Sequence, residues 1–123
     1  MPWLSEHFHT SEFECKCGCG FGSDPSDINP ILVSYLEEIR IEVGFPLKIN
    51  SGCRCVVHNA AVGGTRQSVH TMGDAVDLDL QGVKKRQVMD VAVMLGVPGI
   101  GPYGTFIHLD AHDGSVKARP SCW

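Results

Sequence analysis

Two stretches of the chain carry apolar residues at the three- and four-residue spacing of an amphipathic helix. The first begins at Asn29-Pro30, because the asparagine side chain can cap a helix and proline suits its first position, and it ends at Gly44. Its apolar positions are Ile31, Leu32, Tyr35, Leu36, Ile39 and Val43. The second helix is predicted from about Val83 to Leu95, where Gly96 ends it. Its buried stripe is predicted to be Val88, Val91, Ala92 and Leu95.

Shorter alternating or apolar runs bounded by glycine and proline predict strands. We expect them at residues 46–50, 75–80, 99–103 and 105–109, the last two as a hairpin around Gly104, and a brief helical turn at 56–62. Helices and strands in this order favour an α+β fold, with a small antiparallel sheet and the two main helices packed on one side of it.

The length of 123 residues predicts a single domain spanning residues 1–123. Residues 1–28 form an N-terminal arm that contains cysteines, and residues 14–28 are expected to be a loop because they are rich in Gly, Cys, Ser and Asp.

The strand predicted at residues 75–80 is unusual because Asp77 and Asp79 share one of its faces. Aspartate is depleted in strands, and burying a carboxylate is costly unless it is paired or bound to a cation. His108 and Asp110 share a face of the strand predicted at 105–109 in the same way, so pairing of the two strands would bring all four together. His70, from the loop before the first strand, can reach the same point because Gly73 permits a sharp turn.

Two histidines and an aspartate are a ligand set for zinc, and three protein ligands leave a fourth position for water, as in hydrolases. The sequence therefore predicts one catalytic Zn²⁺ held by these residues. Four further histidines are expected to be surface or hydrogen-bonded residues rather than ligands: His7, His9, His58 and His112.

The six cysteines fall in three places, at 15–19, at 53–55 and at 122. Their even number fits disulfides in an exported chain, and the Cys-Lys-Cys-Gly-Cys run also resembles a metal cluster, although its Cys-x-Cys spacing is tighter than the usual knuckle. Free thiols packed as small apolar groups are a third interpretation. If a second, structural zinc is bound, its predicted ligands are Cys15, Cys17, Cys19 and Cys55.

Composition excludes some classes of function. A net charge of −4 argues against a broad basic surface for nucleic acid. No apolar run approaches the roughly 20 residues that span a bilayer, so no membrane span is expected. The first residues lack the basic and apolar regions of a Sec-type signal peptide, which predicts synthesis in the cytoplasm without such a leader.

Several motifs occur in a fixed order along the chain. They are His9-Thr10-Ser11-Glu12-Phe13, Ser51-Gly52-Cys53-Arg54-Cys55, Asn59, Gly63-Gly64, Ser68-x-His70-x2-Gly73-x-Ala75-x-Asp77 and Phe106-Ile107-His108-Leu109-Asp110. Over roughly residues 8–112 this pattern resembles the zinc D-Ala-D-Ala carboxypeptidase and murein endopeptidase family, in particular its small phage and bacterial peptidoglycan peptidases. The wider group shares its fold and zinc site with the hedgehog signalling domain.

The resemblance implies a role for each matching position. His70, Asp77 and His108 match the three zinc ligands, and Ser68 matches a serine that contacts substrate. Arg54 matches an arginine that holds a substrate carbonyl or carboxylate near the metal and stabilises charge in catalysis, a task that suits the guanidinium fork. A link from the cysteines beside it to the N-terminal arm, by disulfide or zinc, would pin this arginine.

The chain departs from many relatives three residues before the last histidine ligand, where they carry a carboxylate and this chain has Thr105. Asp110 is then the candidate catalytic base, or else a residue that orients His108 through its other ring nitrogen. Asp79 is a third candidate for either role.

The sequence thus predicts a zinc metallopeptidase that cuts a peptide bond in peptidoglycan stem or cross-link peptides and acts on the cell wall, with a phage endolysin or a bacterial enzyme as its setting. The alternative is a catalytically inactive module of the same fold, which recognises the cell wall or forms part of a phage structure, because Thr105 replaces a carboxylate.

Overall fold

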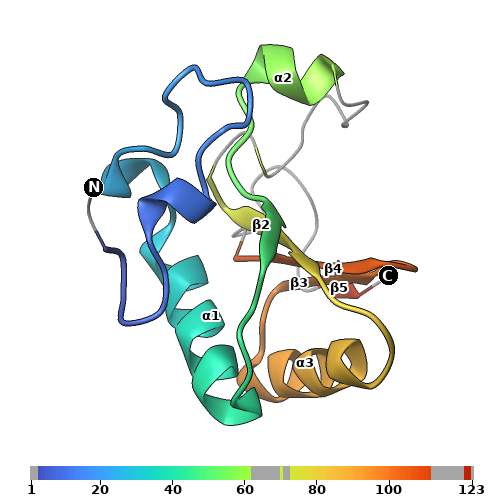
Figure 1. Cartoon of the computed structure of the whole chain (residues 1–123). Coiled ribbons are helices and arrows are strands. Elements are labelled where there is room, and N and C mark those ends of the chain that lie inside the picture. Colours follow the sequence, from blue (N-terminus) through green and yellow to red (C-terminus); the bar gives the residue numbers. More distant parts are fainter. Residues whose placement is uncertain (1–2, 62–69, 71–72, 112–120, 123) are drawn as a thin grey trace.

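The computed structural model describes residues 3–61, 70, 73–111 and 121–122 (Figure 1). Its helices are the short 3-10 helices η1 and η2 and the α-helices α1 to α3: Thr10–Glu12, Pro25–Asp27, Pro30–Val43, Val56–Ala61 and Gly82–Leu95. Its strands, β1 to β5, are Ile49–Ser51, Ala75–Asp79, Gly99–Pro102, Phe106–Asp110 and Ser121–Cys122.

The strands form one sheet in the order β1-β2-β4-β3-β5. The first four strands in this order, from β1 to β3, pair antiparallel with one another, which confirms the predicted antiparallel sheet. β5 was not predicted, and it pairs parallel to β3, with Gly99 opposite Ser121 and Ile100 opposite Cys122. A strand of two residues is too short to show a periodic pattern in the sequence.

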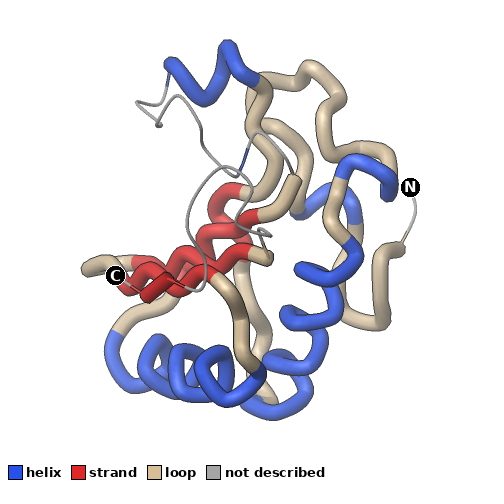
Figure 2. Tube along the Cα trace, turned by 180° about the vertical axis from the view of Figure 1, so that it is seen from behind, coloured by secondary structure: helices blue, strands red, loops and turns tan. Residues whose placement is uncertain are grey.

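Both main helices form where the sequence predicts them. The side chain of Asn29 accepts a hydrogen bond from the backbone N–H of Ile31, and Gly44, with a φ of 75°, ends α1 in the left-handed conformation. Gly96 ends α3 in the same way. In both views α1 and α3 lie on the same side of the sheet, while α2 lies at the end of the molecule away from α3 (Figures 1 and 2). Among the described residues, no helix combines the length and the apolar character that crossing a bilayer requires.

The core lies between these two helices and the sheet. The side chains of Leu36 and Ile39 from α1 and of Val88 from α3 are completely buried with apolar residues of β2 and β4. Not every apolar position of α1 is buried: Ile31 is 57% exposed. Leu32 and Val33, in the same first turn, are buried, so Ile31 lies on the side of this turn that faces away from the core.

Element boundaries differ from the prediction in several places, most of all at β1 and in the N-terminal arm. β1 begins at Ile49 rather than at residue 46, although the carbonyl of Lys48 already accepts a hydrogen bond from Asp79 N. η2 interrupts the segment 14–28, for which the sequence predicts a loop, and η1 precedes that segment in the N-terminal arm. Side-chain caps from His9 and Asp24 close these single turns, and such local hydrogen bonds leave no apolar periodicity.

Gly73 joins the arm to the sheet at close range. It adopts a φ of +71°, and a Cβ at this position would lie 1.9 Å from the carbonyl oxygen of Asp27. Its own carbonyl accepts a hydrogen bond from the backbone N–H of Asn29. The approach of the η2 backbone therefore requires glycine here, at the entry to β2.

Replacing Gly73 tests this packing. Gly44 provides a matched control because it has a φ of +75°, and a Cβ added there would meet no atom within 4 Å. Gly44→Ala should lower the free energy of unfolding by about 1–2 kcal/mol, the cost of the left-handed conformation. Gly73→Ala should cost a further ~1–3 kcal/mol from steric overlap. Denaturant unfolding of both variants measures the difference, and equal losses would contradict the close approach.

Candidate metal centre

The pairing of β2 with β4 brings a carboxylate and an imidazole together. Asp77 lies directly opposite His108 in this antiparallel register, so their side chains leave the same face of the sheet. Val76 and Leu78 alternate with Asp77 and point into the core, as do Ile107 and Leu109 on either side of His108. Burial of the apolar side chains on one face of each strand thus directs the alternating polar side chains to the opposite face.

His70 reaches the same face from outside the strands. Its Nδ1 lies 2.7 Å from the carbonyl oxygen of Gly52, which can only accept, so this nitrogen carries the proton. The backbone N–H of Arg54 in turn donates to the carbonyl of His70. These bonds fix the buried ring with Nε2 facing Asp77, 3.3 Å from its Oδ1.

His108 is oriented by a similar bond on its other side. Its Nε2 lies 2.8 Å from Oδ2 of Asp110 and donates to it, which leaves Nδ1 facing Asp77 Oδ1 at 3.1 Å. Asp110 is completely buried, opposite Ala75 on β2 and Gly99 on β3. A Cβ on Gly99 would lie 2.2 Å from the Asp110 carboxylate, so glycine makes room for it. Sequence reasoning missed Gly99, since its importance lies in its cross-strand neighbour.

Three electron-pair donors therefore converge: His70 Nε2, His108 Nδ1 and a carboxylate oxygen of Asp77. Tetrahedral zinc with bonds of about 2.05 Å holds its ligand atoms about 3.3 Å apart. The observed separations of 3.3 and 3.1 Å fit this geometry. We call these three residues the His/Asp/His group, and its mixed nitrogen and oxygen donors could hold a metal ion.

The charges in this group depend on one another. Burial raises the pKa of Asp77, but hydrogen bonds from His108 and His70 outweigh this effect and lower it well below its usual range. Burial lowers the pKa of His108, whereas its bonds to Asp110 and Asp77 raise it, and the net shift is upward. The site thus favours an ionised carboxylate beside positive charge.

Arg54 lies half-buried directly after Cys53, next to this group. Burial lowers the pKa of its guanidinium, and the Asp77 carboxylate and the Cys15 thiol oppose this shift. Ser68, the other predicted substrate contact, lies outside the described residues.

Asp79 and Thr105 are both exposed, unlike the members of the His/Asp/His group. Asp79 shares a face with Asp77 but is exposed, with an oxygen 4.0 Å from the Lys48 ammonium. Thr105 is exposed in the bend before β4.

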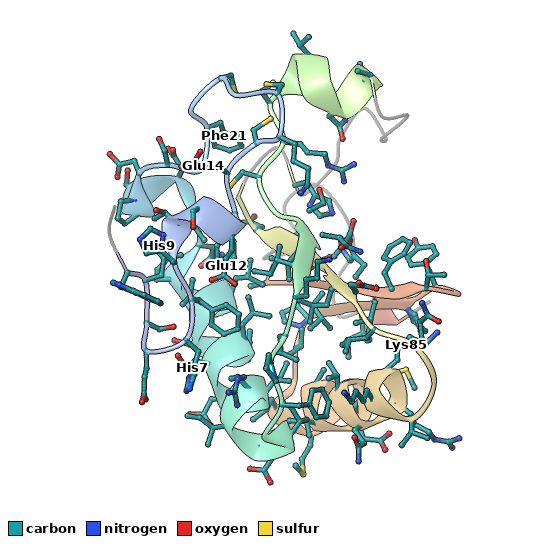
Figure 3. The ribbon with its side chains drawn as sticks, in the orientation of Figure 1. His7, His9, Glu12, Glu14, Phe21 and Lys85 are labelled. Atoms are coloured by element: carbon teal, nitrogen blue, oxygen red, sulfur yellow. The ribbon has the colours of Figure 1, made fainter. Side chains whose placement is uncertain are left out.

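Two other histidines have local structural partners, as expected. His7 donates to Glu37 on α1 through its backbone N–H, and its ring contacts the same carboxylate. His9 caps η1 and accepts from Ser11 N, while its own N–H donates to Glu12 (Figure 3). His112 and the side chain of His58 lie outside the described part of the chain.

Four cysteines meet in a second cluster, formed by Cys15, Cys17, Cys19 and Cys55, whose sulfur atoms all lie within 4.8 Å of one another. None of the five cysteines with described side chains forms a disulfide. The fifth, Cys53, is buried elsewhere, and burial raises the pKa of its thiol to about 12. The side chain of Cys122 is not among those described.

A surface groove of about 480 Å³ lies between the N-terminal arm and α1. Its lining includes Trp3, Ile28 and Val33, and it shares no residue with the His/Asp/His group or with the four-cysteine cluster.

Comparison with known proteins was consistent with this geometry. The sequence profile of a family described as Peptidase M15 matches residues 6–110, which confirms the resemblance seen in the sequence and the α+β fold it implies. No curated protein was found to match the chain.

Zinc titration tests the His/Asp/His group. The imidazole NMR signals of His70 and His108 report on this group and not on the four-cysteine cluster, and we expect them to shift when zinc is added to chelator-treated protein. Removing a ligand in Asp77→Ala should weaken this binding by more than about 100-fold, because changes beyond the ligands already cost 10–100-fold. His9→Ala should leave it unchanged, and equal affinities in both variants would contradict the assignment.

The pH dependence of zinc binding tests the role of Asp110. Zinc needs the neutral ring of His108, so affinity should fall as pH drops through the raised pKa of this histidine. Asp110→Asn removes the carboxylate that raises this pKa, so the fall should move to lower pH, while affinity at high pH decreases by about 10–100-fold. NMR titrations between pH 5 and 8 measure both effects. Asp90→Asn, an exposed change on α3, is the control, and a midpoint unmoved by Asp110→Asn would refute the coupling.

Proposed function

This chain belongs to the peptidase M15 family, a zinc D-Ala-D-Ala carboxypeptidase-like family of metallopeptidases, and on that premise we propose that it hydrolyses a peptide bond in the stem or cross-link peptides of peptidoglycan. The observation that carries the proposal is the convergence of His70, Asp77 and His108, whose donor set and separations suit one zinc ion. When bound, zinc supplies a water of lowered pKa and polarises the scissile carbonyl.

Neighbouring residues orient the proposed zinc ligands. Gly52 and Asp110 each fix the ring of one histidine ligand through the nitrogen that faces away from Asp77. We assign Asp110 the positioning role rather than that of a base, because it is completely buried and lies on the far nitrogen of His108. The exposed Asp79, 4.0 Å from a lysine, is also a poor candidate for the base.

Arg54 gives the site its positive charge. Stem peptides end in free carboxylates, and the tetrahedral intermediate of peptide hydrolysis carries a negative oxygen. A half-buried guanidinium near Asp77 can bind either group with two parallel hydrogen bonds. Ser68 is proposed to add a hydrogen bond to substrate. The protein would then act on the cell wall as a bacterial or phage enzyme, with DD-carboxypeptidase and murein endopeptidase as the candidate types.

A catalytically inactive zinc-binding module is the second candidate. It is favoured by Thr105, which stands where many relatives carry a carboxylate and which is exposed in the bend before β4. Such a module would bind zinc and cell-wall peptides without converting them.

Incubation of zinc-loaded protein with purified muropeptides, followed by mass spectrometry, decides between the two. We expect products that disappear with chelator and return with zinc, and their masses identify the bond. Arg54→Ala should lower kcat/KM about 10²–10³-fold, the usual loss when one donor to a developing oxyanion is removed. Arg86→Ala removes the same charge from the exposed face of α3 and should have no effect. Binding without product from any stem or cross-linked substrate would support the inactive module instead.

A further inference from the structure

We propose that Cys15, Cys17, Cys19 and Cys55 bind a second, structural zinc ion, and that this ion fastens the N-terminal arm to the segment that carries Arg54. We call these four residues the cysteine cluster and Gly52–Cys55 the arginine segment. The zinc site itself does not depend on the proposed function, whereas its effect on Arg54 rests on the role proposed for that residue.

The spacing of the sulfur atoms favours a single tetrahedral ion. Zinc–sulfur bonds of about 2.3 Å place four thiolates about 3.8 Å apart. Cys17 Sγ lies 3.4 Å from Cys15 Sγ and 3.6 Å from Cys55 Sγ, and all four sulfurs lie within 4.8 Å of one another. A disulfide requires about 2.05 Å, so these contacts are too long for one. Iron–sulfur clusters interpose iron and sulfide and hold their cysteines further apart.

Apolar packing does not explain this convergence. Cys17 and Cys19 are exposed, unlike Cys53, which is buried as a small apolar side chain would be. Cys55 joins them from about 40 residues away in the sequence. In Figure 3 sulfur atoms gather where the loop that bears Glu14 and Phe21 meets the chain entering α2. Exposed thiols that meet in this way gain little from burial, but they form a complete ligand set.

The local backbone supports a metal-binding loop despite the tight Cys-x-Cys spacing. Gly18 has a φ of +80°, so the chain turns between Cys17 and Cys19 instead of running straight, and Gly20, with a φ of +94°, turns it again directly after Cys19. The backbone N–H of Cys15 donates to the carbonyl of Phe21 and closes the loop. The backbone N–H of Cys55 points at Cys15 Sγ at 3.4 Å, a bond that stabilises a thiolate ligand.

The arginine segment connects the two clusters, because its successive residues form hydrogen bonds alternately to His70 and to the N-terminal arm. Gly52 O accepts from His70, and the backbone N–H of Arg54 donates to the His70 carbonyl. The alternate residues bond to the arm: Cys53 N donates to Phe13 O at 2.8 Å, and Cys55 N to Cys15 Sγ. Zinc bound to Cys55 would add a strong bond on the arm side. It would thereby fix the backbone on which the Arg54 side chain is carried.

Metal analysis by native mass spectrometry tests the site itself. Wild-type protein prepared with zinc should carry two ions per chain, Cys17→Ala/Cys19→Ala one, and His70→Ala/His108→Ala one. Cys53→Ala, the matched control, should keep two. Cys55→His should also keep two, because three cysteines and a histidine are a common zinc set. Retention of both ions in this variant shows that a substitution in the cluster does not by itself unfold the protein.

The outcomes separate the two sites. If the cysteine double variant binds as many ions as wild type, or if wild-type cysteines prove to be disulfide-bonded, the structural zinc is refuted while the proposed function stands. If the histidine double variant keeps every ion that wild type binds, the proposed catalytic site fails and the cysteine site stands.

A double-mutant cycle tests the effect on Arg54. In Cys17→Ala/Cys19→Ala, with the His/Asp/His zinc retained, kcat/KM should fall about 10–100-fold, since small displacements of a positioning group cost this much. In an Arg54→Ala background the same change should cost almost nothing further. Among single variants of otherwise wild-type protein, Cys55→His should have a higher kcat/KM than Cys55→Ala, because histidine can replace the lost zinc ligand.

Hydrogen exchange gives a readout independent of activity. The amides of Cys53, Arg54 and Cys55 should exchange at least about tenfold faster in the cysteine double variant, since their opening is then less costly. Amides of β2 and β4 should be unchanged. Additive losses in the double-mutant cycle, or unchanged exchange in the arginine segment, would overturn the positioning role.

Discussion

The register between β2 and β4 is the constraint on which the candidate site depends. It places Asp77 directly opposite His108 and Asp110 opposite Ala75, so one polar face carries both a candidate ligand pair and the carboxylate that orients its histidine. A slip of one residue would turn these side chains into the core and Ile107 and Leu109 out of it. The apolar side chains buried under α1 and α3 therefore hold the candidate metal ligands in position.

Glycines and backbone carbonyl groups around Asp77 and His108 allow the close packing of the candidate site and orient its side chains. Gly99 leaves space for the Asp110 carboxylate, and Gly73 lets the η2 backbone approach the entry to β2. The carbonyl of Gly52 fixes the ring of His70. The candidate metal centre thus depends on contacts from the N-terminal arm, from the arginine segment and from three strands, all of which lie within the residues 6–110 that the family profile matches up to the end of β4.

Much of the fold and of the ligand set could be predicted from the sequence. The caps at Asn29 and Gly44 and the alternation around Asp77 are local signals, and each led to the right element. The exposure of Ile31 and the presence of β5 lack such signals, since which side of a helix turn is covered and whether a two-residue strand pairs both depend on distant neighbours. Likewise, spacing alone could suggest that Asp77 and His108 meet, but not which nitrogen of His108 faces which carboxylate.

The sequence by itself determined the chemical types available: two histidines and an aspartate near strands, one arginine between cysteines, and glycines where the chain turns. Those follow from residue identity and from periodicities of two and 3.6, which are properties of the local backbone. Only the tertiary structure decided that Asp110 lies behind His108 rather than beside the third ligand, and that Cys53 stays apart while Cys55 joins the cysteines of the arm. These arrangements depend on packing between segments 30 to 40 residues apart, and local periodicity does not specify how such segments pack against each other.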